Sequence, residues 1–259
     1  VYLNLSNFYS PKLSSISSIF NNCDKLEILD LSNFITYPIN NMDYFFSDFS
    51  NLKYLDISYF ITKSVYSMKY MFNNCINLRT LILSNINTSS VKSMAGLFNN
   101  CLSLSSLNLS SFDTKSVISM EGMFNNCLNL SSLDLSNFNT ISVNSMKNMF
   151  NNCLNLRTLI ISNLITSSVK TMDSMFKGCS NLVSLDLSSF DTHAVQYMQY
   201  MFKNCSSLIS LDLSNFITNS VSLMYELFSN CNNLVYLNIS NFITSKVKIM
   251  MGMFKGCWK

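Results

Sequence analysis

Apolar side chains recur along this chain in a 26-residue frame. In the stretch from Val65 to Ile82, an apolar series falls at spacings i, i+3, i+4 and i+7, which is the pattern of one face of a short helix. Its members are Met68, Met71, Phe72 and Cys75. The pattern repeats so regularly that it predicts a helix of about two turns in every 26-residue unit, called a rung below.

The ends of this predicted helix are also marked. Ser67 precedes the first apolar residue and is a suitable N-terminal cap. The residue before each cysteine is Asn or Gly, as at Asn74 and Gly178, and both types tolerate positive φ. We therefore predict a left-handed residue at this position and a helix that ends near Asn73.

A strand is predicted next in each rung. Leu133, Asp134 and Leu135 alternate apolar and polar residues, as in a strand with one buried face. A bend and a polar stretch, Asn139 to Ser142, then lead to the buried Val143 and the next helix. Stacked rungs would place a parallel sheet on one face and short helices on the other, because a period of this length is typical of solenoids.

A longer, 78-residue period, equal to three rungs, is superposed on the first. Residues 78–94 resemble 156–172, residues 106–117 resemble 184–195, and residues 132–143 resemble 210–221. The only two arginines of the chain, Arg79 and Arg157, are equivalent under this period. We interpret the longer period as duplication of three-rung blocks.

The whole chain, 1–259, is predicted to be one solenoid domain of about ten rungs. It begins inside a strand and stops just after a predicted helix, so we expect a piece of a longer array. The net charge is +3 without a run of basic residues, which does not favour nucleic acid as a partner. No apolar stretch reaches the length of a membrane span.

The repeated motif, seen almost whole from Met120 to Val143, resembles the BspA-like leucine-rich-repeat surface proteins over the full chain. The resemblance implies an α/β fold of right-handed leucine-rich-repeat type, an extracellular or cell-surface location, and an adhesive or ligand-binding role. One feature departs from the broader leucine-rich pattern, which has an asparagine ladder where this chain carries phenylalanine. We therefore predict a phenylalanine spine that includes Phe138, Phe190 and Phe216.

The cysteine column has three possible roles: disulfides, metal binding or packing. Adjacent rungs bring Cα atoms within disulfide range, but no C-x-x-C pair suggests zinc. Phe49 fills the cysteine position in one rung, which favours buried free thiols chosen for volume. We expect no metal and no cofactor. His193 is the only histidine and no nucleophile motif accompanies it, so an enzyme is the least favoured class.

Candidate ligand contacts lie on the outward side of the predicted strands. One column carries aspartates that could bind calcium or a basic ligand; the alternative is solvated acids, because Asn and Ile replace them in other rungs. Neighbouring aromatic and arginine positions are of the type that interfaces favour. The full set is Asp30, Asp56, Asp134, Asp186, Asp212, Tyr54, Arg79, Arg157 and Tyr236.

The predicted function is therefore non-catalytic adhesion, or binding of a protein or glycan ligand, through the strand face of a cell-surface protein. The alternative is a structural protein whose solenoids associate end to end or bundle into extracellular filaments. A cytosolic scaffold is a third possibility.

Overall fold

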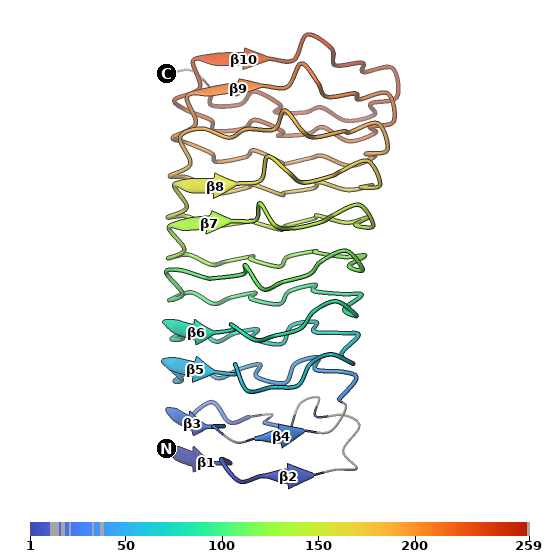
Figure 1. Ribbon diagram of the computed structural model, residues 1–259. Helices are drawn as coiled ribbons and strands as arrows, with labels where there is room; N and C mark the ends of the chain where they lie inside the picture. Colours follow the sequence, from blue (N-terminus) through green and yellow to red (C-terminus); the bar gives the residue numbers. More distant parts are fainter. Residues whose placement is uncertain (11–15, 17–18, 21, 33, 37–38, 258–259) are drawn as a thin grey trace.

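The chain forms a parallel solenoid in which each rung lies on the one before, from the N-terminus to the C-terminus (Figure 1). This computed structural model describes all residues except 11–15, 17–18, 21, 33, 37–38 and 258–259. A ladder of parallel bridges follows one column from Asn41 through Ser67 and Ser93 to Ile249, and it joins nine successive rungs. The predicted solenoid is confirmed, with about nine turns, and the expected number of ten rungs is not confirmed.

The strands are very short, and all except β2 and β4 lie one above another along one edge of the solenoid (Figure 1). In chain order they are β1 (Tyr2–Asn4), β2 (Tyr9–Ser10), β3 (Ile28–Asp30), β4 (Ile35–Thr36), β5 (Tyr54–Asp56), β6 (Thr80–Ile82), β7 (Ser132–Asp134), β8 (Thr158–Ile160), β9 (Ser210–Asp212) and β10 (Tyr236–Asn238). All pairings are parallel, and partner residues are 26 positions apart in the sequence.

The strands form separate pairs and not one continuous sheet. The pairs are β1–β3, β2–β4, β5–β6, β7–β8 and β9–β10. Residues 106–108 and 184–186, which are equivalent and 78 positions apart, form no strand. From β5 onward, each block of three rungs therefore contains one strand pair and one unpaired rung, so the 78-residue sequence period has a direct counterpart in the sheet.

The predicted helices are wrong: the described residues contain no helix. The backbone N–H groups of alternate residues in this segment donate to the next rung instead, for example from Tyr70 to Ala95 (2.8 Å) and from Phe72 to Leu97 (3.0 Å). Asn73, which lies between the N–H donors of this ladder, donates to Tyr70 within its own rung (3.0 Å). The segment is therefore a chain of tight turns that supplies a second hydrogen-bonded ladder between rungs.

Two left-handed residues in each rung explain why the helix does not form. The predicted column before the cysteines is confirmed, with φ of 58° at Asn74 and 75° at Gly178. A second column lies four residues earlier, where Tyr70 has φ of 53°. A residue with positive φ in the middle of the segment cannot continue a right-handed helix. All five glycines of the chain lie in these two columns.

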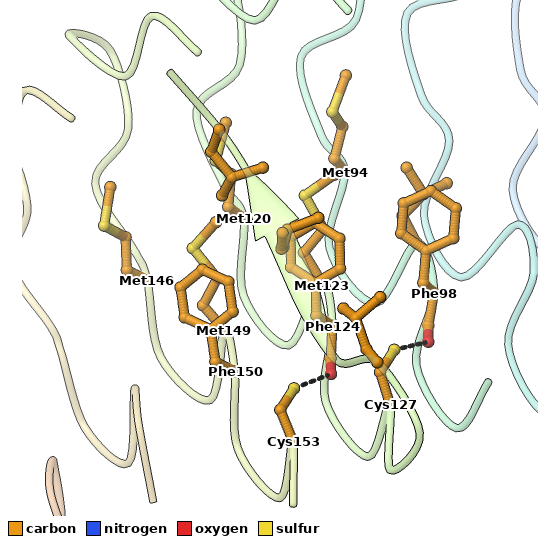
Figure 2. Packing of buried hydrophobic residues seen from close by; sticks show 14 of the residues in the cluster. Met94, Phe98, Met120, Met123, Phe124, Cys127, Met146, Met149, Phe150 and Cys153 are labelled. Atoms are coloured by element: carbon orange, nitrogen blue, oxygen red, sulfur yellow. Dashed lines mark hydrogen bonds between the residues drawn. The ribbon is translucent and has the colours of Figure 1, made fainter. Parts of the chain in front are cut away.

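Identical side chains stack upon one another in the core. The phenylalanine rings from Phe46 to Phe254 form an unbroken column with centroids 5.5–5.7 Å apart. Figure 2 shows Phe98, Phe124 and Phe150 of this column beside the methionines of the same rungs. The predicted spine is present in part: Phe138 stacks on Phe112 (6.5 Å) and Phe216 stacks on Phe190 (6.4 Å), and Leu164 separates these two pairs.

A buried threonine column lies within the polar stretch of each rung. The Oγ1 of Thr140 donates to the carbonyl of Ile165 (2.7 Å) and accepts from the backbone N–H of the same residue (2.8 Å). Equivalent threonines are at most 2% exposed. They are Thr62, Thr88, Thr114, Thr166, Thr192 and Thr218. One hydroxyl thus satisfies two backbone groups of the following rung, which no aliphatic side chain of this shape could do.

Asparagine side chains form two further ladders on the turn segment. Asn100 donates to Asn74 (2.7 Å) in one ladder, and Asn99 donates to Asn73 (2.6 Å) in the other. At Gly178 the first ladder is interrupted, and an added Cβ there would meet the Asn152 Oδ1 at 2.5 Å. The asparagines before the cysteines therefore adopt positive φ and also link the rungs through their amides.

Replacing Thr140 with Val should lower the free energy of unfolding by about 1–2 kcal/mol, because both backbone groups of Ile165 would lose their hydrogen-bond partner. Urea denaturation measures this change. Thr80→Val is the matched control, since Thr80 is exposed in β6 and should change stability little. Equal effects of the two substitutions would contradict the role given to the threonine column.

The two glycines Gly96 and Gly122 should respond differently to Ala. Both have positive φ, so each substitution should destabilise by about 1–2 kcal/mol through backbone strain. At Gly96 the new Cβ would also lie 2.2 Å from the Tyr70 ring, whereas at Gly122 the nearest atom is 3.7 Å away. In thermal unfolding, the melting temperature of Gly96→Ala should therefore be lower than that of Gly122→Ala. The reverse order would be incompatible with this packing.

Candidate functional site: the strand face

The candidate site is the strand face, defined here as the residues equivalent to Arg79, Thr80 and Ile82 in every rung. All nine predicted ligand contacts lie on it. Tyr54 and Tyr236 are 53% and 52% exposed. Arg79 and Arg157 are exposed and form no ion pair with the described part of the chain. These aromatic and basic groups are therefore free to contact a partner.

The aspartate column has a local structural role. The Oδ1 of Asp134 accepts the backbone N–H of Ser136 (2.8 Å), and Asp212 accepts that of Ser214 (2.9 Å). The same bond occurs at Asp30, Asp56, Asp186, Asn4, Asn108 and Asn238. Asp and Asn interchange in this column because either supplies the oxygen that ends the strand with an Asx turn.

Hydrogen bonding lowers the pKa of several of these carboxylates. The backbone N–H of Ser136 lowers the pKa of Asp134, and that of Ser214 does the same for Asp212. Asp186 also has a lowered pKa, chiefly through the Ser188 side chain. These exposed groups therefore carry negative charge at neutral pH and remain possible contacts for a cationic ligand.

The strand register keeps the carboxylates apart. Asp56 lies opposite Ile82, Asp134 opposite Ile160, and Asp212 opposite Asn238. The two pairs of aspartates in neighbouring rungs, Asp30 with Asp56 and Asp186 with Asp212, fall where no strand pairing joins the rungs. Like charges directly opposite each other in paired strands would repel, so this arrangement reduces the free-energy cost of that repulsion. Within the described residues, no group of three or more His, Cys, Asp or Glu side chains is suited to a metal ion.

Two other features of the strand face were not predicted from the sequence. Exposed hydroxyl residues fill the column between Tyr54 and Tyr236, namely Thr80, Ser106, Ser132, Thr158, Ser184 and Ser210. Toward the C-terminus an apolar column is exposed, with Val183 at 47%, Ile209 at 49% and Val235 at 81%. Both columns are visible in the sequence, because each residue type recurs at the same position of successive rungs. Outward serines are also common on surfaces without any function, so the sequence alone does not mark them as a site.

The cysteines lie in the core and not in a reactive site. All nine are free thiols. The Sγ of Cys127 donates to the carbonyl of Phe98, and that of Cys153 to Phe124, each at 3.2 Å (Figure 2). Burial raises the pKa of the Cys153 and Cys231 thiols to about 12, so they stay protonated. The prediction of buried free thiols is confirmed for eight cysteines, whereas Cys23 is only partly buried; most of the thiols also bond to the preceding rung.

A family model described as "Mycoplasma protein of unknown function, DUF285" matches the sequence in four overlapping stretches, residues 14–133, 40–160, 129–235 and 154–259. The chain belongs to this family. The first two DUF285 matches begin at positions 14 and 40, which are one rung apart. A comparison with curated proteins finds no match. No helix among the described residues of this DUF285 chain is long and apolar enough to cross a membrane.

Several solved structures resemble the DUF285 solenoid. A leucine-rich cell surface protein from Faecalibacterium prausnitzii is 18% identical over 92% of this chain and 73% of its own, with a TM-score of 0.39. Leucine-rich-repeat proteins from Eubacterium ventriosum and Bacteroides ovatus are each 17% identical over 99% of this chain, covering 82% and 85% of their own chains, with TM-scores of 0.45 and 0.36. All three are described as leucine-rich, the class that the rung motif resembles.

The buried thiols predict a stability loss in alkali. The pKa of Cys153 is about 12 in the folded chain and near 9 when unfolded, so its contribution is complete below pH 9 and declines as the pH rises toward 12. Relative to wild type, Cys153→Ala should flatten the decline by up to about 1.4 kcal/mol per pH unit. Urea unfolding between about pH 8 and 11, with reductant present, measures this difference.

Val143→Ala serves as the control for the cavity that Cys153→Ala creates, because Val143 is fully buried and does not titrate. It should lower stability by the same amount at every pH. If Cys153→Ala and Val143→Ala gave parallel pH curves, ionisation of the thiol would have no part in the alkaline decline.

Proposed function

We propose that this chain is a non-catalytic surface protein that binds a ligand through its strand face. The supporting observation is the contrast between the strand face and the rest of each rung. Threonine hydroxyls, asparagine amides and cysteine thiols are occupied in bonds between rungs, as at Thr140, Asn100 and Cys127. The arginines, tyrosines and hydroxyls of the strand face are exposed and available for a partner.

Rigid presentation favours binding. The strand-face residues lie on rungs with a packed core, so their backbone is already ordered before a ligand binds. Binding would therefore lose little conformational entropy. The face combines aromatic, arginine and hydroxyl groups, which are common at interfaces. We infer that this face recognises a protein or a glycan.

An extracellular or cell-surface location belongs to the same proposal. It is supported by the resemblance of the rung motif to BspA-like surface proteins. No contact among the described residues favours the filament hypothesis over ligand binding, so assembly into filaments remains the alternative.

The arginines provide the first test of the strand face. The double variant Arg79→Ala with Arg157→Ala should weaken binding of the fluorescently labelled chain to cultured epithelial cells by about tenfold or more, because each arginine is an exposed and unpaired contact. The control is Lys63→Ala with Lys115→Ala, which removes two exposed charges outside the strand face. Equal binding by both variants would contradict this proposal.

The aspartates need a variant that preserves the turn. Asp186→Asn with Asp212→Asn removes two charges but keeps the oxygen that accepts from Ser188 and Ser214, as Asn108 does in its own rung. If the carboxylates contact the ligand, cell binding should fall by about tenfold while the melting temperature stays unchanged. Unchanged cell binding would limit the aspartates to their role in the Asx turn.

A further inference from the structure

The rung that contains residues 106–109 is not joined to its neighbours by a strand ladder. Its neighbours β6 and β7 pair with β5 and β8, on their far sides. Within the described part of the chain, no backbone hydrogen bond joins Leu107, Asn108 or Leu109 to the rung on either side, although the Asn137 side chain reaches the Leu109 carbonyl. In a parallel stack, backbone polar groups point along the axis toward the next rung. Here they face open space.

Two cavities occupy that space. One, of about 310 Å³, lies toward β6 and is lined by residues 81–84 with Asn108, Ser110 and Ser111. The other, of about 230 Å³, lies toward β7 and is lined by residues 107–110 with Asp134, Ser136 and Asn137. Ser110 and Asn108 line both, so a single unpaired rung separates two adjoining hollows on the strand face.

The unpaired rung also differs from its neighbours at one side-chain position that lies between rungs. In the following rung, the Asn137 amide donates to the carbonyls of Leu109 (3.1 Å), Ser110 (3.4 Å) and Phe112 (3.1 Å) and so bridges to the rung before it. The unpaired rung has Ser111 in place of this asparagine, and its shorter side chain makes one bond, to the Leu83 carbonyl (3.2 Å).

The unpaired strand segment and the serine recur three rungs later in the sequence, where the Ser189 hydroxyl donates to the Leu164 carbonyl (3.5 Å). Residues 184–186 are also unpaired, Ser189 replaces the asparagine, and Asn215 bridges from the next rung to the carbonyls of Leu187, Ser188 and Phe190. We call residues 106–111 and 184–189 the open rungs. At the usual strand spacing, the two open rungs are separated by about 14 Å.

The lining indicates the chemistry of a ligand. Unpaired N–H and C=O groups require a partner that both donates and accepts, as a hydroxyl group does. The lining side chains are hydroxyls, amides and apolar groups, among them the half-buried Leu81 and Leu107, with Asp134 as the one charged member. A neutral sugar offers hydroxyls and an apolar face together. An extended peptide would need a free strand edge, which the neighbouring rungs block.

We propose that the open rungs are two subsites for a neutral oligosaccharide, with sugar hydroxyls entering beside Leu107–Leu109 and the equivalent residues 185–187. This inference rests on the proposed binding role of the strand face and specifies one ligand class for it. Two subsites at a fixed separation would bind a long oligosaccharide more tightly than a short one, because the second contact is intramolecular.

The test uses neutral disaccharides and hexasaccharides of glucose, galactose, mannose and N-acetylglucosamine, titrated calorimetrically into the whole chain. At least one hexasaccharide should bind, and more tightly than its disaccharide. Ser111→Asn with Ser189→Asn should weaken that binding at least tenfold, because Ser111 lines the cavity toward β6 and a longer side chain there would narrow it. Ser142→Asn, on an exposed loop, is the matched control and should bind as wild type does.

A second blocking variant is needed because the introduced asparagine could point toward solvent and leave the cavity open. Ser110→Tyr places a large ring where both cavities meet and should abolish binding at the first open rung. Circular dichroism and melting temperature confirm that each variant folds. Absence of binding by every sugar at millimolar concentration, or wild-type affinity in both blocking variants, would overturn the proposal.

The outcomes also separate this inference from the proposed function. If no sugar binds but the arginine variant still loses cell binding, the strand face binds another class of partner and only the glycan inference fails. If a sugar binds at the open rungs while the arginine and aspartate variants attach to cells normally, the glycan subsites stand and the role given to the arginines and aspartates in cell attachment fails.

Discussion

Hydrogen bonds between successive rungs are the constraint on which the rest of the structure depends. No described element is long enough to persist alone, since the strands have two or three residues and the turn segments form no helix. Backbone groups such as the Tyr70 N–H find their partner one rung later, at Ala95. Each rung is therefore stable only between its neighbours, and every buried polar column must match the same column in the next rung.

Stacking each column on itself decides which residue types are tolerated. Phenylalanine on phenylalanine, asparagine amide on asparagine amide and threonine on the next backbone all satisfy this requirement. Aspartate does not, because stacked carboxylates repel. Within paired strands Asp56 and Asp134 lie opposite isoleucine, which keeps one charge in each pair. The sequence variation on the strand face thus follows partly from electrostatics.

Much of this was predictable from the period, including the stacked rungs, the positive φ at Asn74 and the phenylalanine spine. The helix was not, because a chain of tight turns also directs Met68, Met71, Phe72 and Cys75 inward at helix-like spacings. Glycine at equivalent mid-segment positions, Gly96 and Gly122, was the contrary signal. The placement of the candidate site followed from strand alternation. The Asx turns depend on single side-chain bonds, which no periodicity reveals.

The pairing of strands in three-rung blocks has a consequence for how such chains evolve. Deleting or duplicating one whole block joins rungs whose facing columns already match, so the new junction resembles one the fold has already formed. Recombination at other lengths would place Ser111 and Asn137 equivalents out of phase. Lineages can therefore change the length of the solenoid in whole blocks, and each block gained or lost carries one open rung with it.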